Sequence, residues 1–480
     1  MSGGRIFNGV DARTGRYLTA PASEEEFARR IRSSPLTSAQ LLEYKWWVTN
    51  YAPDDPKRAP AQDVDPRDLS SAGWGVLFAP SVSPEVERAL QPLLRHRQQV
   101  AGANFRNYRL PLNRLASKEA FFTETKTRSG PANPKGGKLP YYLLIVGNPA
   151  EISFAFQYDL DVQYAVGRLH FTDKDGQEDI DAYAAYARNV VETEQAAAAR
   201  RTELPPKQIT LFGVSQQGDR ATERAEDALI RPLAQTLTED RQGWRLTRLV
   251  GPQADKEQLS RLLGGSETPS LLLTTSHGMV FPYGDEHQRS RQGALLCQDW
   301  PGDPHPAQPE HYFSGEDLSD EADLRGLISF HFACYSGGTP DVSSFFESSL
   351  SQPKRLAPAP FVSGLAQRLL SHPRGALAVV GHVDKAWSTS FSWSDHSQIG
   401  LYENTLKRLI DGHPIGSAME FFNQCHAELA VDFAELCKIR EKLGEVADTL
   451  FTRIFRANDD VRNFVVLGDP AVKVVYREAA

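Results

Sequence analysis

Two apolar stretches decide the fold of this chain: SLLLTTSHG at residues 270–278 and LISFHFAC at residues 327–334. Each is a short, largely apolar run with a reactive side chain at its carboxyl end. The first ends in His277 followed by Gly278, and the second ends in Cys334. Strands without a polar face belong to parallel sheets that helices cover on both sides. In such sheets, functional groups collect just beyond the carboxyl ends of the strands.

The same pattern recurs from residue 73 onward. Amphipathic helical segments alternate with five further apolar runs: WGVLF (74–78), YYLLIVG (141–147), ITLFGV (209–214), GALAVVGHV (375–383) and FVVLG (464–468). This alternation predicts an α/β fold of mostly parallel sheets flanked by helices. We expect two side-by-side subdomains, residues 73–203 and residues 204–480, each with its own sheet. Residues 1–72 are predicted to be a helical, regulatory segment that ends in a linker rich in Pro and Asp.

Bulk composition excludes several classes of protein. The 480 residues carry 53 Lys and Arg against 61 Asp and Glu, a net charge of −8, which gives no encouragement to nucleic-acid binding. No apolar run approaches the roughly 20 residues of a membrane span, and the N-terminus lacks an apolar signal segment. Four cysteines do not make a disulfide framework in so long a chain. We expect a cytoplasmic location and protein or peptide substrates, with a regulatory protein partner left open and no nucleic-acid or membrane partner.

The two strand ends together predict a catalytic pair. A Cys that ends an apolar strand is most often a buried small hydrophobic residue, but 334 − 277 = 57 residues separate an imidazole and a thiol at corresponding strand ends. If the strands are neighbours, the imidazole accepts the thiol proton and the thiolate attacks a carbonyl carbon. The N–H groups of Gly278 and Cys334 would form the oxyanion hole. The spacing is close to that of caspases, in which the His lies about 50 residues before the Cys.

Taken in order, the motifs resemble the gingipain-type branch of the caspase clan of cysteine peptidases. The similar segments, which span residues 74–476, are YYLLIVGNP (141–149), DLDVQYAVGR (159–168), GALAVVGHVDKAW (375–387) and the terminal FVVLGDPAVKV (464–474). The resemblance implies a caspase-like α/β catalytic unit that cleaves after one preferred P1 residue. It also implies that Asp159 lies at the base of the S1 pocket, with Asp161 as a competing candidate and Trp387 as a wall. An acidic floor and an aromatic wall suit a basic P1 side chain, with Arg the first expectation and Lys the second.

Further expectations concern activation and cofactors. The loop at 284–315 contains Arg289 and Arg291, and we hypothesise that self-cleavage there activates a zymogen. Cys–His chemistry requires no cofactor and no metal; a structural or activating Ca²⁺ is left open. The alternatives are a CHAT-type or other caspase-like protease in a bacterial antiviral defence or signalling complex, and a catalytically inactive regulatory module. A serine hydrolase is disfavoured because GVSQQG (213–218) lacks the second Gly of G-x-S-x-G.

Overall fold

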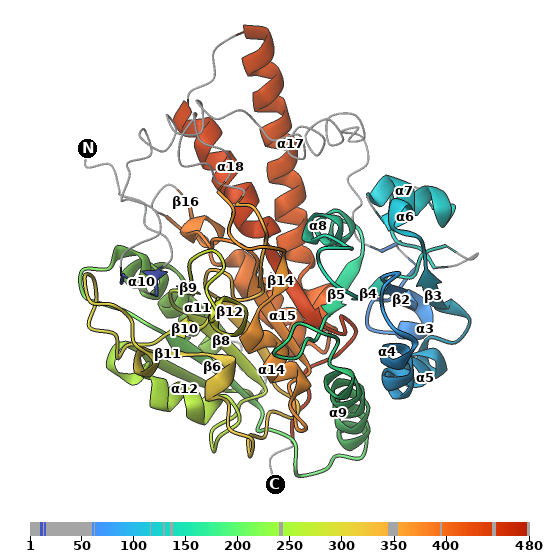
Figure 1. Ribbon diagram of the computed structural model, residues 1–480, viewed down its shortest axis with the longest axis horizontal. Helices are drawn as coiled ribbons and strands as arrows, with labels where there is room; N and C mark the ends of the chain where they lie inside the picture. The colour runs from blue at the N-terminus through green and yellow to red at the C-terminus, as the bar shows by residue number, and fades with distance from the viewer. Residues whose placement is uncertain are drawn as a thin grey trace.

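A computed structural model describes most of the chain from residue 60 onward, together with a short N-terminal piece (Figure 1). The described residues are 10–12, 14–15, 60–61, 63–115, 117–127, 130–134, 138–239, 243–343, 354–393, 396–443 and 448–477. The helices predicted within residues 1–50 therefore lie outside the described residues. In this N-terminal region the structure describes residues 10–12 and 14–15, which include a short strand, β1 (Val10–Asp11).

All seven apolar runs form strands of the central sheet. They become β2 (Trp74–Phe78), β4 (Tyr142–Val146), β6 (Gln208–Gly213), β8 (Leu271–Thr275), β12 (Ile328–Phe332), β15 (Ala378–His382) and β18 (Phe464–Gly468). Nearly every residue in these strands is buried, as expected for a sheet with helices on both faces. The predicted α/β class, with a mostly parallel sheet flanked by helices, is confirmed.

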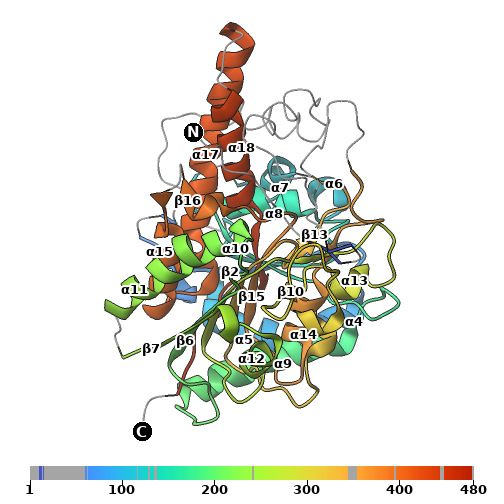
Figure 2. The ribbon, with the colours of Figure 1, turned by 90° about the vertical axis from the view of Figure 1, so that its left-hand side faces the viewer.

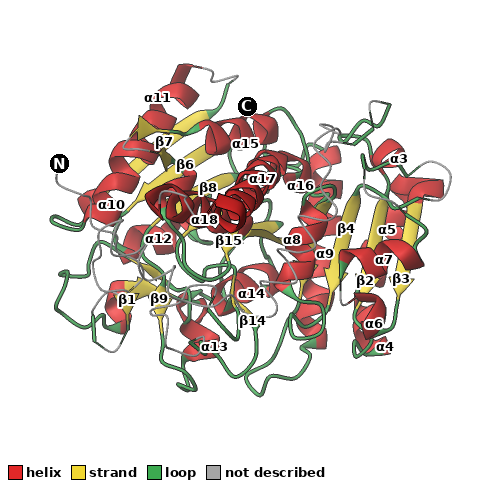
Figure 3. Cartoon of the chain, turned by 90° about the horizontal axis from the view of Figure 1, so that it is seen from above, coloured by secondary structure: helices red, strands yellow, loops and turns green. Residues whose placement is uncertain are grey.

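The two halves share one sheet, which corrects the expectation of two separate sheets. The order of its ten described strands is β3-β2-β4-β5-β18-β15-β12-β8-β6-β7 (Figure 3). β18 joins the halves, because it runs parallel to β5 (Ala165–Leu169) and antiparallel to β15. The C-terminal strand therefore closes a sheet that residues 73–203 begin at one side and residues 204–480 complete.

Three strands of the sheet were not predicted. β5 follows an aspartate-rich helix end, and the two edge strands are β3 (Phe105–Arg109), FRNYR, and β7 (Arg245–Val250), RLTRLV. Each edge strand has one neighbour in the sheet, so charged side chains can alternate with apolar ones. Such polar edges discourage pairing with other chains and leave no continuous apolar run to detect.

Helices cover both faces of the sheet. In Figure 2, α5 (Gln91–Ala101), α9 (Ile180–Ala198) and α14 (Gly364–Ser371) lie on one side, and α11 (Arg231–Glu239) and α15 (Gly400–Ile410) on the other. The remaining helices are α3 (Leu69–Ala72), α4 (Pro84–Ala89), α6 (Leu112–Leu115), α7 (Lys118–Glu124), α8 (Phe154–Asp161), α10 (Arg220–Ala225), α12 (Lys256–Leu262), α13 (Gln288–Arg291), α16 (Ile415–Ala418), α17 (Glu420–Leu443) and α18 (Asp448–Arg462).

The last two helices form an antiparallel hairpin that rises from the body of the molecule (Figures 1 and 2). The base of α18 packs against the loop that follows β15. Among the described residues, no helix combines the length and the apolar character needed to cross a membrane.

Small strand pairs lie outside the main sheet. They are β1 with β9 (Met279–Val280), β10 (Leu295–Leu296) with β11 (Tyr312–Phe313), β13 (Gly338–Thr339) with β14 (Phe361–Val362), and β16 (Ser392–Trp393) with β17 (His396–Ser397). The β1–β9 pair matters for the site, because β9 begins two residues after His277.

Candidate active site

The strands that carry His277 and Cys334 are direct neighbours. β8 and β12 pair in parallel, with Thr275 opposite Phe332, a register offset of 332 − 275 = 57 residues. The same offset places His277 beside Cys334 at the carboxyl edge of the sheet. Gly278 packs directly on the Cys334 backbone, and a Cβ atom at position 278 would overlap the Cys334 carbonyl oxygen. The structure therefore brings the predicted pair to one edge.

A third residue, Asp219, orients the imidazole. Its Oδ2 lies 2.6 Å from Nε2 of His277, and both side chains are almost fully buried. Asp219 also caps α10, because its Oδ1 accepts the backbone N–H of Ala221 at 3.0 Å. Burial alone would raise the pKa of Asp219, but the charge and hydrogen bond of His277 outweigh it, and the pKa lies below its usual value.

Sequence reasoning missed Asp219, although a signal was present. The residue ends the segment GVSQQGD (213–219), which joins β6 to α10. β6 is the next strand after β8 in the sheet, so its carboxyl end reaches the same edge. In a sequence, an aspartate at the start of a helix is usually interpreted as an N-cap residue. Only the strand order shows that this cap also faces His277.

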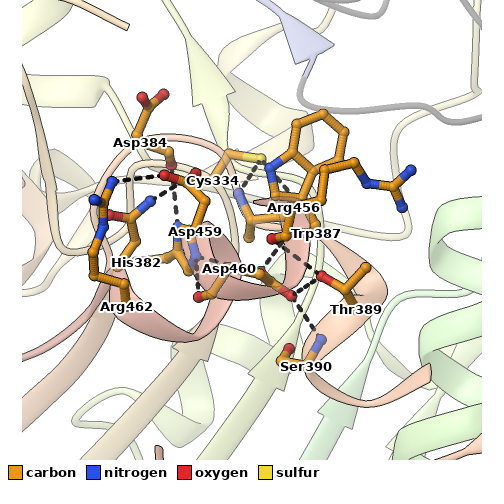
Figure 4. Close-up of polar contacts among 12 residues, drawn as sticks. Cys334, His382, Asp384, Trp387, Thr389, Ser390, Arg456, Asp459, Asp460 and Arg462 are labelled. Carbon is orange, nitrogen blue, oxygen red and sulfur yellow. Dashed lines mark hydrogen bonds and ion pairs between the residues drawn. The ribbon is translucent and has the colours of Figure 1, made fainter. Parts of the chain in front are cut away.

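The Cys334 thiol is enclosed. Its side chain packs in a small apolar cluster with Val280, Tyr335 and Leu356, and only 4% of the residue is exposed. Its sulfur lies 3.3 Å from the backbone nitrogen of Ala386, whose N–H points at it (Figure 4). Burial raises the pKa of the Cys334 thiol to about 12, well above the value at which a thiolate forms near neutral pH. The thiol is therefore enclosed, and its raised pKa favours the protonated form.

The loop after β15 is fixed to α18 by one buried carboxylate. Asp460 accepts the backbone N–H groups of Trp387 and Ser390, each at 2.7 Å, and the hydroxyl of Thr389 at 3.0 Å (Figure 4). His382, at the end of β15, brings its Nε2 within 3.4 Å of the same carboxylate. Because Ala386 lies in this loop, Asp460 also sets the position of the N–H that meets the thiol. Sequence reasoning did not single out Asp460.

Strained backbone flanks the thiol. Tyr335 and Asp384 have φ angles of 60° and 68°, a left-handed conformation that is rare for residues other than Gly. The N–H of Tyr335 donates to the carbonyl of Asp384 at 2.8 Å, which ties the two strained positions together. Such strain gathers at functional sites, where the surrounding structure imposes it.

The two aspartates predicted for the S1 pocket, Asp159 and Asp161, lie in the last turn of α8. Asp159 and Asp161 end α8, which precedes β5, and strand pairing brings this end to the same edge as the carboxyl end of β15. The backbone carbonyl of Asp159 accepts the Lys118 ammonium at 2.8 Å. The Asp161 carboxylate accepts the N–H of Val166 at 3.1 Å, a local cap of the turn into β5. Burial raises the pKa of Asp161 well above its usual value.

Trp387, the predicted wall, is buried in the loop after β15, with 2% of the residue exposed. The guanidinium carbon of Arg456 lies 5.4 Å from the centre of its ring. The S1 roles of Asp159, Asp161 and Trp387 stay predictions.

The backbone hydrogen bonds on either side of Gly278, a residue of the predicted oxyanion hole, do not involve its N–H. Around Gly278, the strand bonds run from Leu296 N–H to the carbonyl of His277 and from Met279 N–H to the carbonyl of Ala294. Neither bond uses the N–H of Gly278. The roles of the Gly278 and Cys334 N–H groups stay a prediction.

The predicted cleavage loop is partly helical. Arg289 and Arg291 lie in α13, a helical turn rather than an extended loop. Asp285 stabilises its start by accepting the N–H of His287 at 2.9 Å, and Arg291 forms an ion pair with Glu316 at 2.7 Å. The expectation of a loop at these two arginines was wrong, because local capping favours the turn.

Fold and site together define an α/β protein with a Cys, a His and an Asp at one edge of its central sheet. Among the described residues, no group of three or more His, Cys, Asp or Glu side chains is arranged to hold a metal ion.

Comparison with known proteins gives only distant structural likeness. No protein-family model matches the sequence, and no curated protein matches it. The structure is similar to the Arg-specific cysteine proteinase gingipain R, with a TM-score of 0.43 and 14% identity over 88% of this chain and 80% of that chain. It is also similar to the complex of the pro- and mature domains of Porphyromonas gingivalis RgpB, with a TM-score of 0.46 and 14% identity over 84% of this chain and 80% of that chain. Likeness at this level says nothing of substrate or catalysis.

Proposed function

We propose that the chain is a cysteine endopeptidase that cleaves proteins after a basic residue, Arg or Lys. The observation that carries the proposal is the register of β8 and β12, which sets His277 beside Cys334, while Asp219 meets the imidazole Nε2 at 2.6 Å. Asp219 caps α10 with one carboxylate oxygen, and its other oxygen meets the imidazole, which fixes the orientation of His277 and stabilises its charged form.

The proposed reaction uses these three side chains. His277 takes the thiol proton, and the sulfur of Cys334 bonds to the substrate carbonyl carbon. The Gly278 N–H stabilises the oxyanion, and the C–N bond breaks as His277 returns the proton to the leaving amine. A water molecule then hydrolyses the thioester, which releases the acid and restores the thiol. Asp219 stays ionised throughout and stabilises the imidazolium.

A panel of fluorogenic peptides with Arg, Lys, Asp or Asn at P1 tests the proposal. We expect the wild type to cleave after Arg or Lys, and Cys334→Ala and His277→Ala to cleave nothing. Cleavage after Asp alone would contradict the basic S1 pocket and leave the catalytic pair standing. No cleavage of any peptide by a chain whose Cys334 reacts with thiol reagents would contradict the peptidase itself.

The second candidate, a catalytically inactive module, has one observation in its favour. The enclosed thiol, whose pKa burial raises to about 12, is the form expected of an inert structural cysteine. An inhibited zymogen would show the same closed site. A peptide-based electrophile decides between them, since a zymogen becomes labelled at Cys334 after activation and an inert module does not.

Self-cleavage between His277 and Cys334 remains part of the proposal. Cleavage at Arg289 or Arg291 requires the α13 turn to open, because peptidases bind extended substrates. The masses of purified wild type and Cys334→Ala test it, and two intact, identical chains would contradict it. Action within a defence or signalling complex is a further proposal, and the partner is sought by purification of Cys334→Ala with its bound proteins.

A further inference from the structure

The side chain of Arg456 lies against the residue predicted to receive the substrate. Arg456 extends from α18, and its guanidinium carbon is 5.4 Å from the ring centre of Trp387, within the range of a cation–π contact. Both residues are buried, with 7% and 2% exposed. Figure 4 draws the indole of Trp387 between Cys334 and the guanidinium group of Arg456. A basic side chain of the protein itself therefore covers an aromatic face next to the thiol.

The same helix holds the rest of the loop. Asp460, one turn after Arg456, binds the N–H groups of Trp387 and Ser390. The carbonyl of Arg456 accepts the hydroxyl of Thr389 at 3.5 Å. One face of α18 thus fixes the loop, and the loop in turn presents the Ala386 N–H to the Cys334 sulfur.

We propose that Arg456 is an internal stand-in for the basic P1 side chain of the substrate, so that α18 keeps the site closed until it moves. This inference rests on the proposed function. It identifies α18 as the element that regulates access to the subsite at Trp387.

The surroundings of α18 allow such a movement. A cavity of about 480 Å³ lies at the base of the hairpin, lined by Thr389 and Ser390 from the loop, by Ala457 and Val461 from α18, and by Phe421 from α17. α18 is therefore incompletely packed on the side next to the residues that fix the loop. The hairpin projects from the body (Figure 2), so a force on its far part would act at this base.

The rate at which iodoacetamide alkylates Cys334 tests the closed state without requiring peptidase activity. Mass spectrometry of the Cys334 peptide separates its signal from those of the other cysteines. We expect Arg456→Ala to raise this rate roughly 10- to 30-fold. This factor corresponds to the free energy of one desolvated cation–π contact. Arg456→Met keeps the stem and its packing, and is expected to behave alike. Arg453→Ala, which removes the same charge one turn earlier on α18, is the control and should match the wild type.

Chemical rescue separates a guanidinium site from a merely structural arginine. Agmatine should slow the alkylation of Cys334 in Arg456→Ala back toward the wild-type rate, whereas n-butylamine, which lacks the guanidinium group, should not. Equal alkylation rates in Arg456→Ala, Arg456→Met and the wild type would overturn the closing role, and rapid alkylation that agmatine does not slow would overturn the stand-in. Agmatine rescue without cleavage of any peptide would support the guanidinium site and defeat the peptidase proposal.

Discussion

The ionisation of one thiol decides whether this site is active as it stands. Burial raises the pKa of the Cys334 thiol to about 12, well above the value of about 8.5 for a free thiol, so the thiolate is a minor form near neutral pH. The raised pKa follows from burial among apolar side chains, which disfavours the charged form.

The first prediction is a pH profile for that thiol. The rate of Cys334 alkylation in the wild type should still rise about tenfold per unit between pH 8 and pH 10, because the pKa lies above this range. Peptide mass spectrometry after timed exposure to iodoacetamide measures it. A plateau near pH 8.5 would mean that the thiol is solvated and that the closed site is not the state in solution.

The second prediction concerns Asp219→Asn. An amide keeps the shape of the carboxylate but cannot stabilise an imidazolium, so kcat/KM for basic peptides should fall by at least about 100-fold. The alkylation rate of Cys334 in the closed state should stay at the wild-type value, because Asp219 contacts His277 and not the thiol cluster. Steady-state kinetics and alkylation are read on the same preparation. Unchanged kcat/KM would remove Asp219 from the mechanism.

At the scale of elements, β1 adds a strand beside the site. Val10 pairs with Met279 and Asp11 with Val280, and the N–H of Ala12 donates to the Val280 carbonyl at 2.8 Å. Val10 is fully buried in a cluster that includes Met279 and Phe281. A segment far away in the sequence thus supports the strand that follows His277.

The third prediction tests this support. Val10→Asp should detach β1, because an unpaired carboxylate in an apolar cluster is costly. Amide hydrogen exchange of residues 279–281 should then become faster, while β12 at the centre of the sheet keeps its protection. Thr14→Ala changes an exposed residue of the same segment and is the control. Equal amide exchange rates at residues 279–281 in both variants would show that β9 is stable without its pairing to β1.

At the scale of the whole molecule, Asp469 joins the two halves of the sheet. It lies just after β18, is fully buried, and accepts Trp74 Nε1–H at 2.9 Å and Arg97 Nε–H at 2.6 Å. Its own N–H donates to the hydroxyl of Tyr186 at 2.6 Å. Arg97 also pairs with Glu194, so the C-terminal strand is tied to α5 and α9 of the first half. Asp469, in the terminal FVVLGDPAVKV segment, therefore has a structural role.

The fourth prediction follows from that network. Asp469→Ala leaves the Arg97 charge buried with one partner removed, and should lower the free energy of unfolding by about 3–5 kcal/mol. Urea unfolding measures the change. The control is Asp227→Ala, which breaks an exposed pair with Arg231 and should cause no measurable shift. Similar urea unfolding midpoints for the two variants would mean that Asp469 does not contribute to holding the two halves of the sheet together.

Seven buried strands, the α/β class and the two side chains at the sheet edge could all be predicted from the amino-acid sequence. These follow from local rules, because these seven buried strands are largely apolar runs, and the 57-residue spacing of two strand ends equals the register of β8 and β12. β5 is also fully buried, but Arg168 interrupts its apolar run and it was missed. The edge strands β3 and β7 were missed because exposure lets polar residues into them. The helical turn at Arg289 and Arg291 was missed because the Asp285 contact before it is a local detail among loop-like residues.

Long-range contacts alone establish that β18 joins the halves into one sheet, that Asp219 faces His277, that Asp460 of α18 holds the loop after β15, and that Arg456 lies over the ring of Trp387. Each of these contacts joins segments that lie 50 or more residues apart, and a buried charge reads in sequence like any exposed one. The burial that raises the pKa of Cys334 comes from residues on several separate segments, so no stretch of sequence around the cysteine could have indicated it.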